Sequence, residues 1–335
     1  MTVTQNQLHK ISYVTLSTDI EAHSIVFQTV ADMESPRVLS IQSHVVHGYV
    51  GNKSATFPLQ VLGFEVDPIN SVQLSNHTGY KSFKGQILNE NDLSKFYYDL
   101  IESLKHNNLL NYTHLLTGYV GSPSFLNKIV DLVKELRQIN PNLVYVCDPV
   151  MGDNGKLYVP ESLLPIYQDL LIPLADVITP NQFELELLTG HKINSIDDAW
   201  TAINTFHNKS NCSTVIVSSS NLGTENELIA LASSNAGGKE KRVLLKFPKL
   251  PGNFTGTGDL FAALFLAWNY KTKNNLTKSL EYTISTLQSL LKRTLNIAKE
   301  SSNGQPLTHA QLELKIIQSK NDIEDPKVTV QAVEL

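Results

Sequence analysis

A glycine-bearing tetrapeptide in the C-terminal third is the sharpest chemical feature of this sequence. The stretch Gly256-Thr257-Gly258-Asp259 directly precedes a very apolar run, residues 260–270, that predicts a helix. Glycines let a backbone approach a ligand closely, and the free N–H groups at a helix start bind anions. An aspartate there could accept a proton from an attacking hydroxyl while those N–H groups stabilise a phosphoryl group in transfer. The alternative is that Asp259 only caps its helix.

Two further polar stretches follow apolar runs that predict buried strands. Asp148 and Asp153 come after residues 143–147, and such hard oxygen ligands at a strand end suit Mg²⁺ bound to nucleotide phosphates. Asn181 and Glu184 come after the next strand, with the spacing of a helix capping box. Each stretch alone also fits an ordinary acidic turn or a helix cap. Their places at the ends of successive strands favour one shared site.

Two familiar nucleotide-binding motifs do not fit. The stretch Gly48-Tyr49-Val50-Gly51-Asn52-Lys53-Ser54 resembles a P-loop, but an asparagine separates its second glycine from the lysine and the glycines are too closely spaced. Gly256 and Gly258 begin a dinucleotide-binding pattern, whose last glycine position is Phe261. The sequence therefore supports neither of these nucleotide folds.

The predicted elements alternate as in a parallel sheet with crossover helices. The runs that predict strands are residues 38–41, 114–116, 143–147, 176–178 and 214–217. The predicted helices are residues 90–106, 123–137 with Ser122 as N-cap, 260–270, 276–298 and an amphipathic stretch over 307–323. The longest loops are expected around residues 48–53, 75–84, 151–158 and 235–252. Open α/β sheets bind ligands in such loops at strand ends.

Composition narrows the range of functions. The 335 residues are 41% hydrophobic and 18% charged, enough for a packed core, and the net charge of -5 comes without a basic stripe. We therefore expect no nucleic-acid partner, and the lack of an apolar run of about 20 residues predicts no membrane partner. Only two cysteines occur, so we expect neither a disulfide framework nor a zinc site. The same observation predicts a cytoplasmic location. Residues 1–35 predict a poorly ordered N-terminal extension to a single domain, residues 36–335.

Taken together, these motifs resemble the ribokinase-like superfamily, and within it the pyridoxal (vitamin B6) kinase family of eukaryotes. The similarity covers nearly all of residues 37–335, and its most telling stretches are residues 37–45, 56–64, 75–80 and 116–119. The resemblance implies an α/β fold: a ribokinase-like three-layer α/β/α sandwich with a mostly parallel central sheet. It further implies a homodimer that uses ATP, Mg²⁺ and a monovalent cation, K⁺ or Na⁺, to phosphorylate the 5′-hydroxyl of pyridoxal, pyridoxine or pyridoxamine.

The resemblance also implies roles for individual residues. Gly256, Thr257 and Gly258 would form an anion hole, and Asp259 would deprotonate the attacking hydroxyl. The residues expected at the substrate ring are Ser43, Thr78, Tyr119 and His77. The residues expected at the nucleotide are Asp148, Tyr158 on a flap, Thr179, Asn181, Gln182, Phe183, Glu184, Ser218, Ser219 and Thr257. The residues expected near metal ions are Asp153, Asp148, Thr179 and Glu184.

Two alternatives stay open at this level. A kinase of the same fold could act on hydroxymethylpyrimidine or another small alcohol, because the superfamily shares the anion hole and the base. A non-catalytic relative could bind vitamin B6 without turning it over. The flap, residues 153–158, is compact compared with animal members, and residues 235–252, where adenine contacts are expected, follow the family pattern least.

Overall fold

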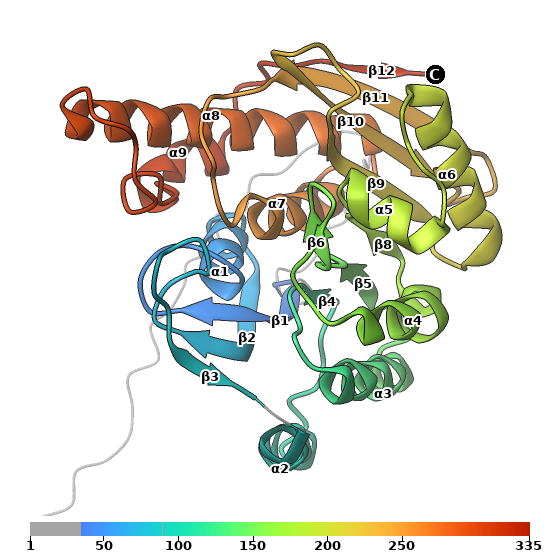
Figure 1. The fold of residues 1–335 in the computed structure, drawn as a ribbon. Helices are drawn as coiled ribbons and strands as arrows, with labels where there is room; N and C mark the ends of the chain where they lie inside the picture. The colour runs from blue at the N-terminus through green and yellow to red at the C-terminus, as the bar shows by residue number, and fades with distance from the viewer. Residues whose placement is uncertain (1–34, 89) are drawn as a thin grey trace, which may run out of the picture. The chain divides into compact units, whose positions relative to one another are not determined.

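A ten-stranded sheet runs through the computed structural model, which describes residues 35–88 and 90–335 (Figure 1). From edge to edge its strands are β12 (Ala332–Glu334), β11 (Lys241–Pro248), β10 (Glu227–Ser234), β9 (Thr214–Ser220), β8 (Val177–Ile178), β5 (Val144–Cys147), β4 (His114–Thr117), β1 (Arg37–Val45), β2 (Glu65–Leu74) and β3 (Gly85–Ile87). The six strands from β9 to β2 are parallel, whereas β3, β10, β11 and β12 pair antiparallel. The predicted mostly parallel sheet is confirmed.

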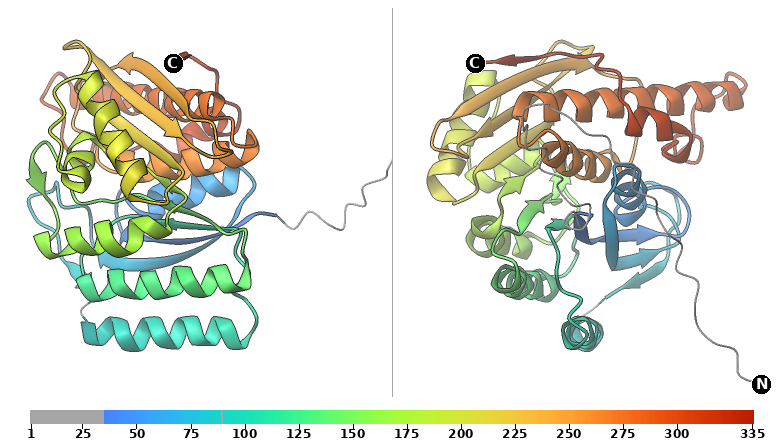
Figure 2. Two further views of the ribbon diagram at one scale, coloured as in Figure 1. Left: turned by 90° about the vertical axis from the view of Figure 1, so that its right-hand side faces the viewer. Right: turned by 180° about the vertical axis from the view of Figure 1, so that it is seen from behind.

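Helices cover both faces of this sheet (Figure 2). One face carries α2 (Glu90–His106), α3 (Pro123–Ile139), α4 (Leu164–Ile166), α5 (Gln182–Thr189) and α6 (Ile196–Lys209), and the other carries α1 (Asn52–Val61), α7 (Thr257–Lys271), α8 (Leu276–Ser302) and α9 (Lys320–Glu324). Strand side chains alternate between the two cores: Leu39 and Ile41 face the first and Val38 the second. The fold is therefore the expected three-layer α/β/α sandwich.

Helix α7 is buried almost all round. Every residue from Leu260 to Trp268 is buried, between the sheet, α1 and α8. A helix that is apolar on all sides belongs in the interior, and here it fixes the direction in which its first turn points. None of the helices in the described part of the chain is both long and apolar enough to span a bilayer.

Most of the predicted elements are present. The five runs predicted as strands fall on β1, β4, β5, β8 and β9, and four of the predicted helices are α2, α3, α7 and α8. Ser122 caps α3 as expected, accepting a hydrogen bond from the backbone N–H of Phe125. The predicted extension, residues 1–35, lies outside the described residues except for Ser35, and Ser35–Leu335 forms one compact unit.

Two predicted segments are wrong. The helix expected over 307–323 is instead a series of turns, a 3₁₀ turn (Ile317–Ser319) and the short α9. In those turns Leu312, Leu314 and Ile316 are buried in the apolar cores and the Glu313 carboxylate is drawn to distant loops, a pattern that one helical face cannot satisfy. The loop expected over 235–252 contains β11, whose alternating buried and exposed residues pair with β10.

A buried polar network fastens the start of α1 to the sheet. The Asn52 side chain accepts a hydrogen bond from Ser40 Oγ at 2.8 Å and donates to Ile69 O at 2.9 Å and Asn70 Oδ1 at 2.8 Å. Asn52 is 2% exposed, so its own side chain cannot exchange these partners for bulk water. The network therefore holds the 46–51 loop, which leads into α1, at the end of β1.

Replacing Asn52 by alanine should destabilise the fold. Because buried partners lose their hydrogen bonds, we expect the free energy of unfolding to fall by about 2 to 3 kcal/mol. Urea unfolding measures the change, with Gln60→Ala on the exposed end of the same helix as the control, expected within about 0.5 kcal/mol of wild type. An Asn52→Ala variant as stable as that control would contradict this reading.

Candidate active site

The first turn of α7 presents backbone donors at the carboxyl ends of the parallel strands. Gly256 is the N-cap of the helix, with φ 83° and ψ 9°, and a Cβ at this position would overlap the carbonyl oxygen of Tyr49. Glycine is therefore required both by the left-handed backbone and by the close approach. The first N–H groups of a helix have no acceptor within it and carry the positive end of its dipole. This edge is suited to bind an anion.

Asp259 lies in that first turn and is only partly exposed. Burial raises the pKa of its carboxyl, and a hydrogen bond from the backbone N–H of Gly51 opposes the shift. A carboxylate with a raised pKa is a stronger base than an exposed aspartate. The position combines a proton acceptor with the amide donors beside it.

Asp148, which follows β5, faces the same turn. A Cβ on Gly258 would lie 3.7 Å from Asp148 Oδ2, so this carboxylate is adjacent to the backbone of α7. Burial, followed by the negative charges of Glu184 and Asp259, raises the pKa of Asp148 well above its ordinary value, and the Thr179 hydroxyl works against that rise. Residues from β5, β8 and α7, far apart in sequence, thus meet at one place.

The oxygens at this place fit a cation. Asp148 Oδ2 and Thr179 Oγ1 are buried and close to each other, but neither forms a hydrogen bond of normal length and angle with the described residues. A buried carboxylate oxygen without a partner is costly unless a cation or donor binds it. No group of three or more His, Cys, Asp or Glu side chains in the described chain is placed to hold a metal ion by itself. Mg²⁺ commonly takes only one or two carboxylates and completes its shell with phosphate and water oxygens.

Glu184 connects the segment after β5 to the segment after β8. Its Oε1 accepts hydrogen bonds from the N–H groups of Met151 at 2.9 Å and Gly152 at 3.4 Å, and its Oε2 accepts one from Asn181 at 2.9 Å. Asn181 completes a capping box at the start of α5 and donates to Gly152 O at 2.8 Å. Burial raises the pKa of Glu184 to about 7, although these backbone hydrogen bonds oppose the rise. The capping role of Asn181 and Glu184 is therefore confirmed, and their role at the site stays a prediction.

The predicted flap is a small hairpin of β6 (Gly152–Asp153) and β7 (Lys156–Leu157), beside α5 in Figure 1. Asp153 is exposed on it and accepts hydrogen bonds from the backbone and side chain of Asn154. Tyr158 is 59% exposed, with its backbone N–H bonded to Met151 O at 2.8 Å. The Tyr158 side chain is therefore exposed, whereas the Asp153 carboxylate is hydrogen-bonded to its neighbour Asn154.

The residues predicted to bind the substrate ring come from three strand ends. Ser43, in β1, packs so closely on Gly51 that a Cβ there would overlap its carbonyl oxygen, and Gly51 in turn donates to Asp259. Tyr119, after β4, is half-buried, and burial raises its pKa. Thr78 is exposed in the loop between β2 and β3. Gly51 thus brings Ser43 next to the proposed base.

His77 differs from these residues because both of its ring nitrogens are already bonded within the protein. Nδ1 accepts a hydrogen bond from the N–H of Gly79 at 3.1 Å, and Nε2 lies 3.3 Å from Glu313 Oε1. The side chain is 6% exposed. Only its carbon atoms remain for contact with a ligand, so the predicted substrate role is confined to packing.

The other predicted nucleotide residues surround the α5 start. The Gln182 side chain connects two loops: it donates a hydrogen bond to Ile193 O at 2.8 Å and accepts one from the N–H of Asn221 at 3.1 Å. Phe183 packs against Gly152 beneath the flap. Ser218 bonds to Pro180 O through its N–H at 3.0 Å, and Ser218 and Ser219 are half-buried at the end of β9. The side chains of Gln182 and Ser218 are thus both hydrogen-bonded within the protein.

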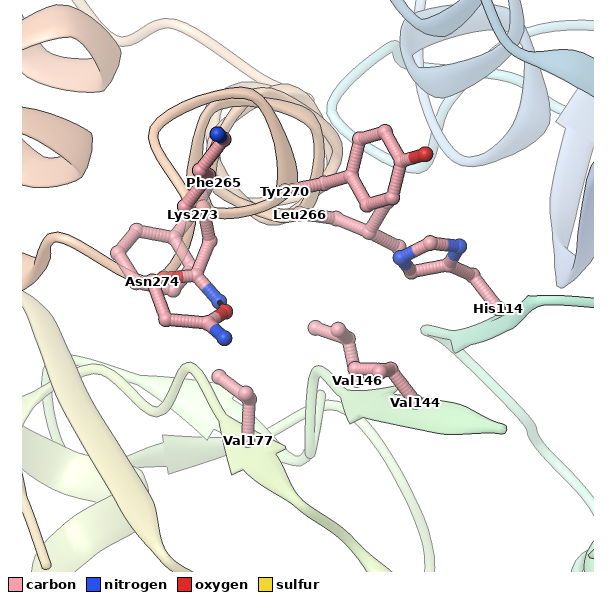
Figure 3. A pocket seen from close by; sticks show the side chains of 10 residues that line it. His114, Val144, Val146, Val177, Phe265, Leu266, Tyr270, Lys273 and Asn274 are labelled. Atoms are coloured by element: carbon pink, nitrogen blue, oxygen red, sulfur yellow. Dashed lines mark hydrogen bonds between the residues drawn. The ribbon is translucent and has the colours of Figure 1, made fainter. Parts of the chain in front are cut away.

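A separate cavity of about 270 Å³ lies at the other end of the parallel strands, where they begin (Figure 3). It is lined by residues at the beginnings of β4, β5 and β8 and at the end of α7, among them His114, Val144, Val177 and Tyr270. Burial lowers the pKa of His114 to about 4, so its ring is neutral. The cavity contains none of the predicted site residues.

The sequence predicted a long loop around residues 48–53, of the kind that binds ligands at strand ends, but did not place it beside the proposed base. In the structure Tyr49 O contacts Gly256, and Gly51 donates to Asp259. Its paired glycines, Gly48 and Gly51, both with positive φ, were the available signal. Glu313 was missed as well, because nothing in its neighbourhood marks a contact with residues more than 230 positions away.

Comparison with known proteins gives consistent results. A family model described as Phosphomethylpyrimidine kinase matches residues 112–305. Pyridoxal kinase of Arabidopsis thaliana is 52% identical over 299 residues, covering 89% of this chain and 94% of that protein. Pyridoxal kinase of Homo sapiens is 51% identical over 315 residues, covering 90% and 99%. Pyridoxal kinase from Leishmania donovani in complex with ADP and pyridoxamine has a TM-score of 0.81 at 35% identity, covering 89% of this chain and 99% of that one.

The pKa of Glu184 predicts how stability changes with pH. Because the pKa of about 7 in the folded state exceeds the ordinary value of about 4.3, folding favours the protonated carboxyl. Its stabilising contribution is complete below about pH 4 and is lost as the pH rises through 7. We expect the ligand-free wild type to lose about 2 kcal/mol more than Glu184→Gln between about pH 5 and about pH 8. Urea unfolding at both pH values checks this, and equal losses would contradict it.

Proposed function

The chain belongs to the pyridoxal kinase family, and on that basis we propose that it transfers the terminal phosphoryl group of ATP to the 5′-hydroxyl of pyridoxal, pyridoxine or pyridoxamine at the first turn of α7. The observation that carries this proposal is the meeting of Asp259, the α7 amides and the buried Asp148 at one edge of the sheet. The kinase domain is residues 36–335. We also propose a homodimer in the cytoplasm, on the resemblance alone.

The geometry supports a direct transfer. Asp259 takes the proton of the acceptor hydroxyl as its oxygen attacks the γ-phosphorus, the bond to the bridging oxygen breaks, and ADP leaves. The N–H groups of Gly256, Thr257 and Gly258 form the anion hole that stabilises the negative charge on the moving phosphoryl group. The transition state of such a transfer is loose, so positioning and charge stabilisation matter more than base strength.

Residues on the nucleotide side are suited to cations. Asp148 and Thr179, with their unpartnered buried oxygens, would hold a monovalent cation, and Asp153 and Glu184 would lie near Mg²⁺. Bound cations would neutralise the nucleotide phosphates and relieve the repulsion among the buried carboxylates. The remaining nucleotide contacts would come from Asn181, Phe183, Ser218 and Ser219, and the hairpin with Tyr158 would close over the phosphates and exclude water.

The acceptor side distinguishes this site from its alternatives. Ser43 lies against Gly51, next to the proposed base, and Ser43, Thr78 and Tyr119 would bind the polar edges and the face of a pyridine ring. A hydroxymethylpyrimidine kinase is the second candidate, because the matching family model is described as Phosphomethylpyrimidine kinase, the name of a kinase that acts on a related pyrimidine. A non-catalytic relative is not favoured, since Asp259, Asp148 and Glu184 are all present and close together.

An assay of purified protein decides between the acceptors. We expect ATP-dependent phosphorylation of pyridoxal, faster than that of hydroxymethylpyrimidine, because the ring-binding residues match the pyridine family. Activity should require Mg²⁺ and should increase with K⁺ or Na⁺. A faster reaction with hydroxymethylpyrimidine would replace the first proposal by the second, and no transfer to any alcohol would favour the non-catalytic relative.

Replacing Asp259 by alanine removes the proposed base. We expect kcat to fall by about 10²-fold to 10⁴-fold while the Kd of pyridoxal changes little, because the carboxylate acts on the hydroxyl in the transition state. Steady-state kinetics and direct binding measure the two quantities. Asp197→Ala, an aspartate in the first turn of α6, serves as a control with unchanged kcat. Normal turnover by Asp259→Ala would show that another group is the base.

A further inference from the structure

Glu313 is a buried carboxylate in the C-terminal segment, residues 305–316, and none of the roles above involves it. It is 7% exposed, and its contacts lie far away in the sequence. Oε1 accepts a hydrogen bond from the Tyr80 hydroxyl at 2.9 Å and lies 3.3 Å from His77 Nε2. Oε2 accepts one from the backbone N–H of Tyr49 at 3.0 Å. One side chain therefore ties the 46–51 loop and the 75–84 loop to the C-terminal segment.

The hydrogen bonds fix the state of each partner. His77 Nδ1 accepts from the N–H of Gly79, so the ring proton is on Nε2 and points to Glu313. Burial, the hydrogen bond to Glu313 and its charge raise the pKa of Tyr80 to about 12, so the phenol stays a donor. Burial would raise the pKa of Glu313, but hydrogen bonds from His77, Tyr80 and Tyr49 hold it below its ordinary value. Glu313 is thus an ionised acceptor surrounded by donors.

Close packing leaves the cluster little freedom. A Cβ on Gly48 would overlap the Glu313 carboxylate, so the 46–51 loop passes directly over it. On the other side, the His77 ring meets Tyr80 edge-on with centroids 4.7 Å apart, and His309 packs beside both rings. His77 and Tyr80, on either side of Thr78, are therefore both held by Glu313.

The 46–51 loop connects this cluster to the chemistry. Tyr49, whose N–H is bonded to Glu313, has its carbonyl oxygen against Gly256 in the anion hole. Two residues later, Gly51 packs on Ser43 and donates to Asp259. A shift of the Tyr49 backbone would therefore move the 46–51 loop, with its Ser43 contact, relative to the fixed base and anion hole of α7.

We propose that Glu313 is a positioning residue for phosphoryl transfer, whose carboxylate holds the 46–51 and 75–84 loops in the arrangement that places the acceptor alcohol against Asp259. This inference rests on the proposed function. It assigns the C-terminal segment a role in acceptor binding, and it assigns His77 the role of carrying Thr78 rather than of bonding to the substrate ring.

The test is Glu313→Gln in the full-length protein. The amide keeps the shape, but it has one acceptor oxygen, so either Tyr49 or the His77 and Tyr80 pair faces a donor. We expect the KM for pyridoxal to rise about tenfold or more and kcat to fall, while the KM for ATP stays within about twofold. A merely structural loss would lower the active fraction, and so kcat, without changing either KM. A KM for pyridoxal within about twofold of wild type would overturn the proposal.

Matched variants make the result specific. Asp322→Asn removes an acid from an ion pair with Arg293, at 2.6 Å, in the same C-terminal region but away from the two loops, and should leave both KM values unchanged. Tyr80→Phe removes a single donor and should raise the KM for pyridoxal by a smaller factor, about threefold. If Glu313→Gln fails to fold, Tyr80→Phe decides: an unchanged KM for pyridoxal overturns the proposal.

Hydrogen exchange gives a readout that does not depend on turnover. In Glu313→Gln, the amides of residues 46–51 and 75–84 should exchange at least about tenfold faster than in wild type, with α7 unchanged. Unchanged exchange in both loops overturns the positioning role even if the wild type proves inactive on pyridoxal. An inactive wild type with loosened loops would instead refute the proposed function and leave Glu313 as the residue that orders the loops.

Discussion

The main constraint on this structure is that three carboxylates lie close together at the carboxyl ends of the buried parallel strands. Burial raises the pKa values of Asp148, Glu184 and Asp259, and the negative charge of the neighbours adds to the rise for Asp148. Three features offset this cost: the first turn of α7, the backbone N–H groups around Glu184, and the N–H of Gly51. At this place Asp148 Oδ2 and Thr179 Oγ1 are buried and still lack partners among the described residues. Such an edge is prepared for cations and for the phosphates that they accompany.

The topology makes this meeting possible. The ends of β1, β4, β5, β8 and β9 lie along one edge because these strands are parallel, so residues separated by more than a hundred positions approach the same point. Helix α7 is buried on all sides, so its first turn is fixed in place rather than adjustable. The C-terminal segment contacts the 46–51 and 75–84 loops through Glu313, which bonds to Tyr49 and Tyr80. The proposed base, phosphate site and acceptor pocket thus depend on contacts between residues that are distant in sequence.

The sequence predicted the parts whose signals are local. Gly256 to Asp259 before an apolar helix, the acids after β5 and the capping box at Asn181 and Glu184 each have recognisable spacing, and the layered fold followed from alternation of strands and helices. It could not predict contacts that bridge long separations. Tyr49 O against Gly256, and Glu313 against Tyr49, are set by tertiary packing alone. The same reason explains the wrong helix over 307–323, where burial of Leu312, Leu314 and Ile316 overrides an amphipathic pattern.

The central claim is that the Asp259 carboxylate and the α7 amides face the acceptor alcohol and the terminal phosphate at the same time. A crystal structure with pyridoxal and a non-hydrolysable ATP analogue measures it most directly. We predict an Asp259 carboxylate oxygen about 2.6 to 3.2 Å from the 5′-oxygen, with the γ-phosphate against the N–H groups of Gly256 to Gly258. A closed complex in which that carboxylate lies well beyond hydrogen-bonding distance of the hydroxyl would contradict the account.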